Sequence, residues 1–270
     1  MRFLSLLLSC ALVASCGGPG QQQQQGGGGA TPPADEKIRI GAFMSLTGDT
    51  GQYGLSASNG MLMAVEEANT QGGVGGRRVE LMVRDTRSDV GETVRVVSQF
   101  IGEAHVHALL GEIVSSRSLI AAPVAQAAGV PMLTPSSTSA EITTVGDYVF
   151  RSCYADPFQG AAIAQFAAHT LQARRAAMLL DREQEYSIRL AQYIHEAFRG
   201  QGGEVVAEEV YEAGAADFTP QLLEISRARP DVVFVPGYYL EAGLLARQAR
   251  ELELNVPLVG GDGWDSPRLF

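Results

Sequence analysis

The chain has 270 residues, of which 46% are hydrophobic, and a formal net charge of -10 at neutral pH. Binding to nucleic acid depends on clustered cations that neutralise phosphates, so this acidic balance argues against nucleic acid as a partner. The length allows either two modest domains or one large one.

The first sixteen residues have the pattern of an export signal. Arg2 provides a short positive region, and the apolar run 3–14 follows it. That run is shorter than the about 20 residues that a transmembrane helix needs. The sequence VASC at 13–16 resembles the lipobox of bacterial lipoproteins, in which the cysteine, here Cys16, is lipidated and becomes the mature N-terminus. An ordinary cleavage site followed by an incidental cysteine is the alternative.

Residues 17–36 favour the lipoprotein interpretation. They include five consecutive glutamines and four consecutive glycines, and they contain almost nothing that could form a core. A flexible chain of about 20 residues spans roughly 25 Å, enough for a folded body to stand clear of a membrane. We therefore expect residues 1–16 to be a lipoprotein signal with Cys16 retained and lipidated, and residues 17–36 to be a flexible tether.

Strand and helix signals alternate from Lys37 onward. Apolar runs predict strands at 38–44, 79–85, 106–110, 130–133, 148–151, 175–181, 204–211, 231–236 and 256–260. Helical patterns fall between them, at 55–71, 89–104, from 115, and at 157–172, 186–200, 217–228 and 239–253. Continuous apolar strands are typical of parallel sheets that are covered on both faces. The alternation predicts an α/β fold with two lobes, each a doubly wound, mostly parallel sheet flanked by helices: residues 37–152 and 153–270.

Signatures of catalysis, of metal binding and of nucleotide binding are missing from the sequence. It has no P-loop, no dinucleotide-binding glycine motif and no serine hydrolase or zinc protease motif. His105 and His107 could share a metal only with a third ligand, and none is nearby. Cys153 stands alone in the folded body, so we expect a buried, small apolar side chain and no disulfide there. We expect neither an enzyme nor a protein with a metal or cofactor.

Hydroxyl groups follow two neighbouring strands of the first half. The strand at 106–110 leads to Ser115 and Ser116, which open a helix, and the strand at 130–133 leads to the sequence TPSSTS at 134–139. Ligands of open parallel sheets bind outside the carboxyl ends of the strands, and a helix N-terminus suits a carboxylate. These groups include no acid, base or metal ligand, so they predict a binding surface and not a reaction centre.

Strand ends of the second half carry aromatic side chains and a carboxylate. The strands at 175–181, 231–236 and 256–260 lead to Tyr186, Tyr238 and Asp262, and the first strand of the chain leads to Tyr53. If the halves face each other, hydroxyl and N–H groups form one wall of a cleft, and the aromatic and acidic groups form the other.

Structural roles are the alternatives at each of these positions. Ser115 could be the N-cap of its helix, and Thr138 with Glu141 fits a capping box. The three tyrosines could belong to the core, and Asp262 could be a turn residue. Spacing alone does not decide between these roles and ligand binding.

The chain resembles the periplasmic branched-chain amino acid binding proteins, the Leu/Ile/Val-type receptors of ABC importers, which have the type I periplasmic binding protein fold. The matching stretches run in order over nearly the whole body, at 38–41, 48–54, 64–69, 72–76, 83–86, 111–116, 131–139 and 260–263. The resemblance implies a ligand site between the lobes, formed by Tyr53, Ser115, Ser136, Thr138, Tyr186, Tyr238 and Asp262. In that family pattern, the Ser115 and Thr138 hydroxyls bind the ligand carboxylate, the Ser136 carbonyl and Asp262 take its ammonium, and the tyrosines close over it.

The function that this resemblance implies is that of an extracytoplasmic solute-binding lipoprotein, anchored to the cell membrane. It would bind a branched-chain or other aliphatic amino acid as a monomer, close around it and deliver it to a membrane permease. A ligand-sensing receptor of the same fold is one alternative, and a binder of small amides, urea or aromatic acids is another. Two departures stand out. Val114 occupies a position that archetypal members use for a disulfide, and the family continues beyond the point that matches Phe270, so we expect a C-terminally truncated member.

Overall fold

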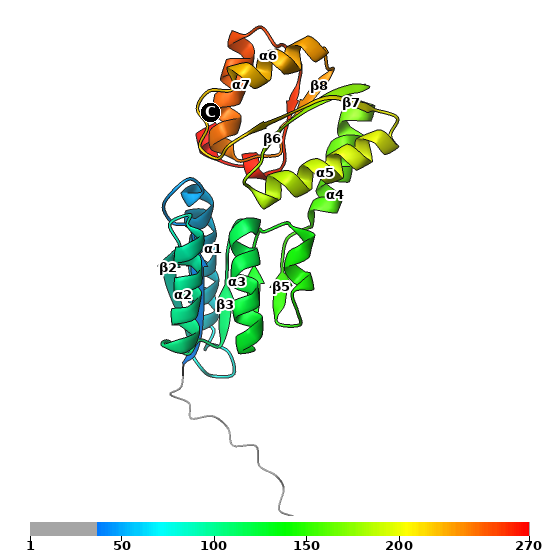
Figure 1. Ribbon diagram of the computed structural model, residues 1–270. Coiled ribbons are helices and arrows are strands. Elements are labelled where there is room, and N and C mark those ends of the chain that lie inside the picture. Colours follow the sequence, from blue (N-terminus) through cyan, green and yellow to red (C-terminus); the bar gives the residue numbers. More distant parts are fainter. Residues whose placement is uncertain (1–36, 270) are drawn as a thin grey trace, which may run out of the picture. The chain divides into compact units, whose positions relative to one another are not determined.

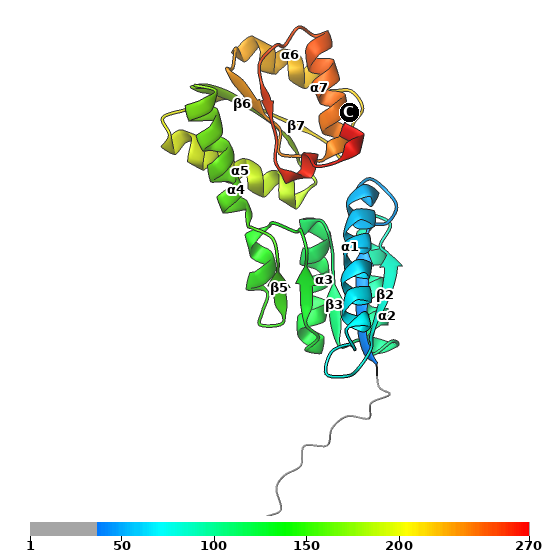
Figure 2. The same ribbon diagram turned by 180° about the vertical axis from the view of Figure 1, so that it is seen from behind.

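The computed structural model describes residues 37–269, which form two parallel β-sheets with helices on both faces (Figures 1 and 2). The first sheet has the order β2-β1-β3-β4-β5, from β1 (Ile38–Met44), β2 (Val79–Asp85), β3 (Ala108–Leu110), β4 (Met132–Thr134) and β5 (Val149–Arg151). The second has the order β7-β6-β8-β9, from β6 (Arg175–Asp181), β7 (Glu204–Tyr211), β8 (Val232–Phe234) and β9 (Leu258–Val259). The predicted α/β fold is confirmed. We call each sheet with its helices a lobe.

Seven α-helices of the described residues connect the strands: α1 (Gly51–Thr70), α2 (Val90–Gly102), α3 (Ser115–Ala128), α4 (Asp156–Gln165), α5 (Glu185–Gly200), α6 (Thr219–Ala228) and α7 (Tyr239–Glu251). Short 3-10 turns lie at Ala140–Thr144, Asp262–Trp264 and Pro267–Leu269. The chain passes from the first lobe to the second between β5 and α4. The predicted signal (1–16) and tether (17–36) lie outside the described residues.

Most element boundaries agree with the sequence-based expectation to within a few residues. Two helices and several short strands differ from it. Helix α1 begins at Gly51, four residues before the predicted start at residue 55. Glycine is a poor helix former, so Gly51 and Gly54 hide this first turn from a prediction based on sequence. The helix predicted at 157–172 ends at Gln165 and continues as a π-helical turn, Phe166–Thr170. Strands β3 and β4 begin two residues later than predicted, and β8 and β9 are shorter than predicted at both ends.

Local signals account for several helix ends. The Asp89 side chain caps α2 by accepting a hydrogen bond from the Glu92 backbone N–H at 2.6 Å. Gly129 ends α3 in the left-handed conformation, with φ of 65°, which glycine adopts without strain. Pro157 and Pro220 lie in the first turns of α4 and α6, where their missing N–H groups are not needed.

Each strand of the second sheet places alternate residues on opposite faces. Met178 and Leu180 of β6 pack against α4 and α5, whereas Leu179 between them packs against α6 and α7. Burial on both faces explains why these strands are continuously apolar.

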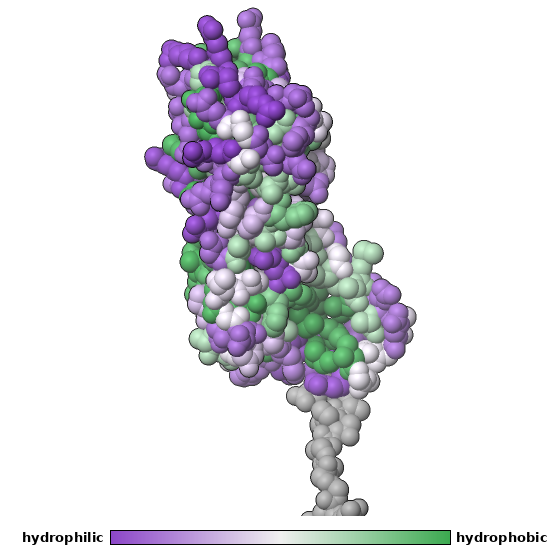
Figure 3. All heavy atoms as spheres, turned by 90° about the vertical axis from the view of Figure 1, so that its right-hand side faces the viewer, coloured by the Kyte–Doolittle hydropathy of each residue, from purple (hydrophilic) through white to green (hydrophobic). Residues whose placement is uncertain are grey.

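The first sheet is covered less evenly. Helices α2 and α3 bury Leu109, Met132 and Val149 on one face, and α1 packs on the other face against β1 and β2. Leu110, Leu133 and Phe150 are register neighbours, and Phe150 is 50% exposed. Figure 3 shows apolar residues gathered around a hollow in the lower half of its view, which is the first lobe. Among the described residues, this face is therefore only partly covered.

Helix α1 approaches the end of β1 closely at Gly54. A Cβ atom there would overlap the Ser45 carbonyl oxygen, which is a backbone atom and cannot rotate away. Gly60, two turns further along the exposed side of α1, has open space around its Cα. The close approach at Gly54 places the first turn of α1, with Tyr53, beside the carboxyl end of β1.

We predict that Gly54→Ala lowers the free energy of unfolding by about 2 kcal/mol or more, because the added methyl group forces α1 away from β1. Gly60→Ala is the matched control and should raise stability by about 0.5–1 kcal/mol, since alanine is the better helix former. Urea denaturation of both variants checks this. Equal stabilities for the two variants would contradict the packing argument.

Candidate ligand-binding site

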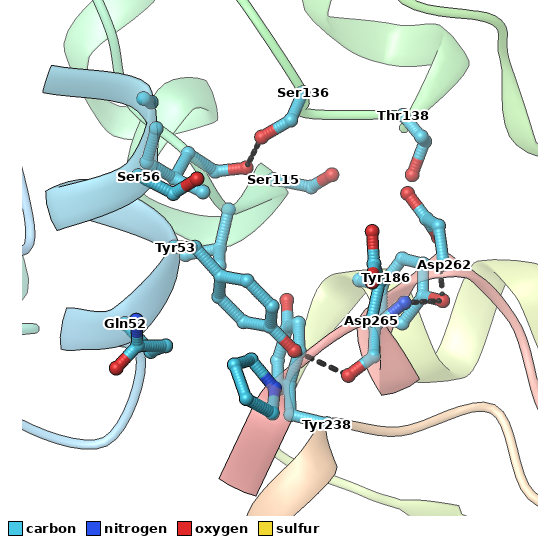
Figure 4. A pocket seen from close by; sticks show the side chains of 15 residues that line it. Gln52, Tyr53, Ser56, Ser115, Ser136, Thr138, Tyr186, Tyr238, Asp262 and Asp265 are labelled. Atoms are coloured by element: carbon cyan, nitrogen blue, oxygen red, sulfur yellow. Dashed lines mark hydrogen bonds between the residues drawn. The ribbon is translucent and has the colours of Figure 1, made fainter. Parts of the chain in front are cut away.

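Loops at the carboxyl ends of both sheets line one pocket of about 450 Å³ (Figure 4). In the first sheet the strand order reverses between β1 and β3, and in the second between β6 and β8. Such switch points are where ligands of open α/β sheets bind. All seven predicted site residues line this pocket: Tyr53, Ser115, Ser136, Thr138, Tyr186, Tyr238 and Asp262. The remaining lining residues are Gln52, Ser56, Ala57, Ile113, Val114, Gly263, Asp265 and Pro267.

Ser115 is the first residue of α3, and it does not cap the helix. The N-cap is Val114, which makes no side-chain cap bond. The Ser115 Oγ instead accepts a hydrogen bond from the Ser139 backbone N–H at 3.1 Å, and the Ser136 hydroxyl donates to the Ile113 carbonyl at 2.8 Å. The N-cap alternative for Ser115 is therefore wrong. The first N–H groups of α3 are left without a side-chain cap at a helix end that favours negative charge.

Thr138 does not form a capping box with Glu141. The 3-10 turn after it begins at Ala140, its N-cap is Ser139, and the Ser139 hydroxyl donates to the Glu141 carboxylate at 2.7 Å. Thr138 is buried, and its carbonyl accepts a hydrogen bond from the Asp156 N–H at 3.0 Å. Figure 4 shows the side chains of Thr138 and Asp262 pointing toward one another.

Asp262 is held in place by two side chains of the second lobe. Its Oδ1 accepts hydrogen bonds from the Tyr186 hydroxyl at 2.8 Å and from the Gln159 amide at 3.0 Å. The Gln159 oxygen in turn accepts from the Asp262 backbone N–H at 2.7 Å. Burial raises the pKa of Asp262, and these hydrogen bonds oppose the rise without cancelling it. No arginine, lysine or histidine of residues 37–269 forms an ion pair with this carboxylate.

The three tyrosines form one aromatic cluster across the pocket. The rings of Tyr186 and Tyr238 stack with centroids 5.2 Å apart, and Tyr53 lies tilted against Tyr238 at 6.2 Å. Burial raises the pKa of all three phenols, so each is neutral at physiological pH. The Tyr238 hydroxyl has no hydrogen-bond partner among the described residues, which leaves it able to contact a ligand.

Four polar contacts made by side chains link the lobes around the pocket, in addition to the backbone hydrogen bond from Asp156 to Thr138. The Tyr53 hydroxyl donates to the Gly263 carbonyl, and the Tyr239 hydroxyl donates to the Asp49 carbonyl at 2.9 Å. The other two contacts are a hydrogen bond from Ser116 Oγ to Gln184 Oε1 at 3.2 Å and an ion pair between Arg189 and Glu141 at 3.4 Å. The Arg189–Glu141 ion pair is partly exposed and contributes little by itself, whereas the three hydrogen bonds are partly buried.

A second buried carboxylate, Asp156, lies behind the pocket wall. Neither of its side-chain oxygens has a partner in normal hydrogen-bond geometry, and the residue is fully buried. Burial raises the pKa of Asp156 to about 6, and the charge of Asp262 adds to the rise. The Thr138 hydroxyl, the Gln159 amide and the Arg151 cation act in the opposite direction. No sequence signal marked Asp156 or Gln159, because neither directly follows a strand.

The sequence reasoning also missed Glu112 and Arg117. Glu112 lies in the same stretch as Ser115, but the binding surface predicted for that stretch rests on its hydroxyl groups alone. Its side chain is fully buried beneath the turn that leads into α3. An acidic residue two positions after β3, with an arginine five residues later, is the signal that could have identified this pair.

Cys153 is only partly buried, which corrects the expectation of a fully buried side chain. Its Sγ donates to the Ser137 carbonyl at 3.5 Å. Burial raises the pKa of the thiol to about 11, so it is not an activated nucleophile. Among residues 37–269, no group of three or more His, Cys, Asp or Glu side chains could hold a metal ion.

Comparisons with known proteins agree on one family. The family model described as periplasmic binding protein matches residues 37–268. The leucine-, isoleucine-, valine-, threonine- and alanine-binding protein of Pseudomonas aeruginosa is 32% identical over 85% of this chain and 61% of its own length. The Leu/Ile/Val-binding protein BraC3 of Rhizobium johnstonii is 30% identical over 86% of this chain and 63% of its own. The chain thus spans about three fifths of the length of these curated relatives.

Two solved structures are similar throughout the described part. The leucine-binding protein LivK of Thermotoga maritima is 37% identical, with a TM-score of 0.83, over 86% of this chain and 65% of that one. The branched-chain amino acid transporter substrate-binding protein LivJ of Streptococcus pneumoniae, solved with isoleucine, is 32% identical, with a TM-score of 0.82, over 87% and 66%. All four relatives are binding proteins, which supports the expectation that this chain is not an enzyme. From the family model and these relatives together, the chain belongs to the periplasmic binding protein family.

Proposed function

We propose that this protein is an extracytoplasmic solute-binding protein of an ABC importer and that its ligand is a branched-chain or other aliphatic amino acid. The observation that carries the proposal is the pairing of opposite walls in one pocket. Hydroxyl groups and the N-terminus of α3 form one wall, and the partly buried Asp262 lies on the other.

The charges of the pocket favour a zwitterion. Asp262 and Asp265 are its ionisable carboxylates, and no arginine, lysine or histidine lines it. A buried carboxylate without a counter-ion is costly, so a ligand ammonium that pairs with Asp262 is strongly favoured. An aromatic acid, which has no ammonium, would leave Asp262 unpaired, and the pocket therefore argues against that alternative.

Each end of an amino acid has a matching set of groups. The N–H groups of α3 with the Ser115 and Thr138 hydroxyls suit the carboxylate, and the Ser136 carbonyl with Asp262 suits the ammonium. Tyr53, Tyr186 and Tyr238 close over the ligand and surround its side chain. The ligands named for the relatives support the same assignment: leucine, isoleucine, valine, threonine and alanine for the Pseudomonas protein, and isoleucine for the Streptococcus protein.

Delivery would follow from closure of the lobes around the ligand. Hinge closure around ligands is an established motion of two-lobed binding proteins. The contacts that link the lobes here are a few polar contacts and the packing of Tyr53 against Tyr238 and Tyr239, so closure and opening would exchange a limited set of interactions. In this proposal a monomer with bound ligand is recognised by a membrane permease.

We predict micromolar or tighter binding of leucine, isoleucine or valine, measured by calorimetry. Asp262→Ala should weaken that binding by about 2–5 kcal/mol, because the ligand ammonium then lies buried without its counter-charge. Glu224→Gln, on the exposed face of α6, is the control and should leave the affinity for the amino acid unchanged.

The deaminated analogue of leucine, 4-methylpentanoate, makes the test specific. It should bind far more weakly than leucine to the unchanged protein, and Asp262→Ala should not weaken it further. If the protein binds the analogue as tightly as leucine, or binds amides and no amino acid, the amino-acid assignment is wrong.

Affinity should also depend on pH. A ligand ammonium favours ionised Asp262, and it offsets the negative charge of Asp262 that helps to raise the pKa of Asp156, so it favours ionised Asp156 as well. Burial raises the pKa of both carboxyls, that of Asp156 to about 6. Protonation therefore competes with the ligand, so affinity is constant above about pH 7 and falls as the pH drops through 6. We expect a loss of about three- to tenfold at pH 5, measured by calorimetry. Asp156→Asn should flatten this profile, and exposed Asp147→Asn should leave it intact.

Membrane attachment would come from Cys16, which lies outside the described residues. Among the helices that the structure describes, none combines the length and apolar character needed to span a bilayer. We propose that a lipid on Cys16 anchors the protein on the outer side of the cell membrane, with residues 17–36 as the tether. A single short chain binds membranes only marginally, so stable anchoring requires the multiple acyl chains of a lipoprotein.

We predict that Cys16→Ser abolishes metabolic labelling with an alkyne fatty acid and shifts the protein from the membrane fraction to the soluble fraction. Cys153→Ser is the matched control and should remain labelled and membrane-bound, because this thiol lies within the folded part. Unchanged labelling of the Cys16 variant would contradict the lipoprotein assignment.

A further inference from the structure

A buried ion pair lies directly beneath the hydroxyl wall of the pocket. The Glu112 Oε2 accepts hydrogen bonds from the backbone N–H groups of Ile113 and Val114, at 2.6 and 2.9 Å. Both residues line the pocket, next to Ser115. The other oxygen, Oε1, accepts from the Ser45 and Thr86 hydroxyls at 2.6 and 2.8 Å. This carboxylate thus ties the ends of β1 and β2 to the turn that enters α3.

Glu112 would be harmful to carboxylate binding if its charge stood alone. It is fully buried, and its carboxylate contacts the backbone of the residues just before Ser115. A negative charge next to these residues repels any anion at the N-terminus of α3, and it offsets the partial positive charge of that helix end. Hydrogen bonds from neutral hydroxyl and N–H groups stabilise Glu112 without removing its net charge.

Arg117 is the cation that faces this carboxylate. Its Nε lies 3.3 Å from Glu112 Oε1, and both side chains are almost completely buried, at 5% and 0% exposure. The guanidinium is fixed by two further contacts, from Nη2 to the Thr50 hydroxyl at 2.6 Å and from Nη1 to the Ser88 carbonyl at 3.3 Å. Nε itself has no hydrogen-bond partner, so charge and not hydrogen bonding links it to Glu112.

The charges of this pair also act on a residue of the second lobe. The charges of Arg117 and Glu112 act in opposite directions on the pKa of Tyr238, whose hydroxyl is buried in the same pocket. The pair therefore lies close enough to influence the electrostatic potential inside the pocket.

We propose that Arg117 is a specificity-determining positioning residue: by cancelling the buried charge of Glu112, it allows the N-terminus of α3 to select ligands that carry a carboxylate. Arg117 does not line the pocket and acts through Glu112 and the turn at 113–115. This inference rests on the proposed binding of an amino acid.

The test compares L-leucine with L-leucinamide, which keeps the ammonium and the side chain and replaces the carboxylate with a neutral amide. Arg117→Met leaves Glu112 uncompensated, so the ratio of leucine affinity to leucinamide affinity should fall by about tenfold. Glu112→Gln leaves the positive charge of Arg117 uncompensated, and the same ratio should rise. The double variant Glu112→Gln/Arg117→Met has no buried charge and should return the ratio to within about threefold of the unchanged protein.

Opposite effects of the two partners distinguish this role from a structural one. If the pair only maintains the fold, both single variants lower the affinities for leucine and leucinamide equally, the ratio stays constant, and the proposal is overturned. If Arg117→Met does not fold, the response of Glu112→Gln decides: a rise of its ratio supports the proposal, and a constant or lower ratio overturns it. Arg95→Met, an exposed arginine on α2, is the control that should leave both affinities unchanged.

Failure of the proposed function gives a different result. In that case the unchanged protein binds neither leucine nor leucinamide, or binds both with equal affinity, before any variant is made. Measured by calorimetry on the full chain, these outcomes separate a wrong ligand class from a wrong role for Arg117.

Discussion

The unpaired negative charge of Asp262 is the constraint on which the candidate site depends. Tyr186 and Gln159 orient this carboxylate by hydrogen bonds but cannot neutralise it, because both are uncharged. Stacking of Tyr186 on Tyr238 places the aromatic ring beside the same group. The second lobe thus maintains a buried anion whose cost is offset only when a cation arrives. In the proposed function, selectivity for an ammonium follows from this carboxylate.

The two walls differ in whether their carboxylate has a counter-ion. On the first lobe, Glu112 is paired with Arg117, so the wall has no net charge, and the dipole of α3 determines its preference. On the second lobe, Asp262 has no such partner. A zwitterion is complementary to this asymmetry, since its carboxylate meets N–H and hydroxyl groups and its ammonium meets a carboxylate. A ligand with one charge would satisfy only one wall.

Sequence reasoning succeeded where a signal is local and failed where a contact is long-range. The strand ends at Ser115, Tyr186 and Asp262 were recognisable because parallel strands end at the same edge of a sheet. The capping roles at Ser115 and Thr138 are wrong, because Val114 and Ser139 occupy the N-cap positions, and the Ser115 hydroxyl accepts a tertiary hydrogen bond from Ser139. Gln159 lies 103 residues from Asp262 in the chain, and no helical pattern reveals that such an amide clamps a distant carboxylate.

Helix α4 connects the two walls physically. Its first residue, Asp156, donates its backbone N–H to the Thr138 carbonyl of the first lobe, and Gln159, one turn later, holds Asp262 of the second lobe. The helix begins where the chain crosses between the lobes, so the carboxylate wall and the ammonium wall share one rigid element at the crossover. Motion of the lobes about this point would change the opening of the pocket on the side of Tyr53 and Ser56 more than the distance between Thr138 and Asp262. The groups for the two charged ends would therefore keep their spacing while the pocket opens to admit the ligand.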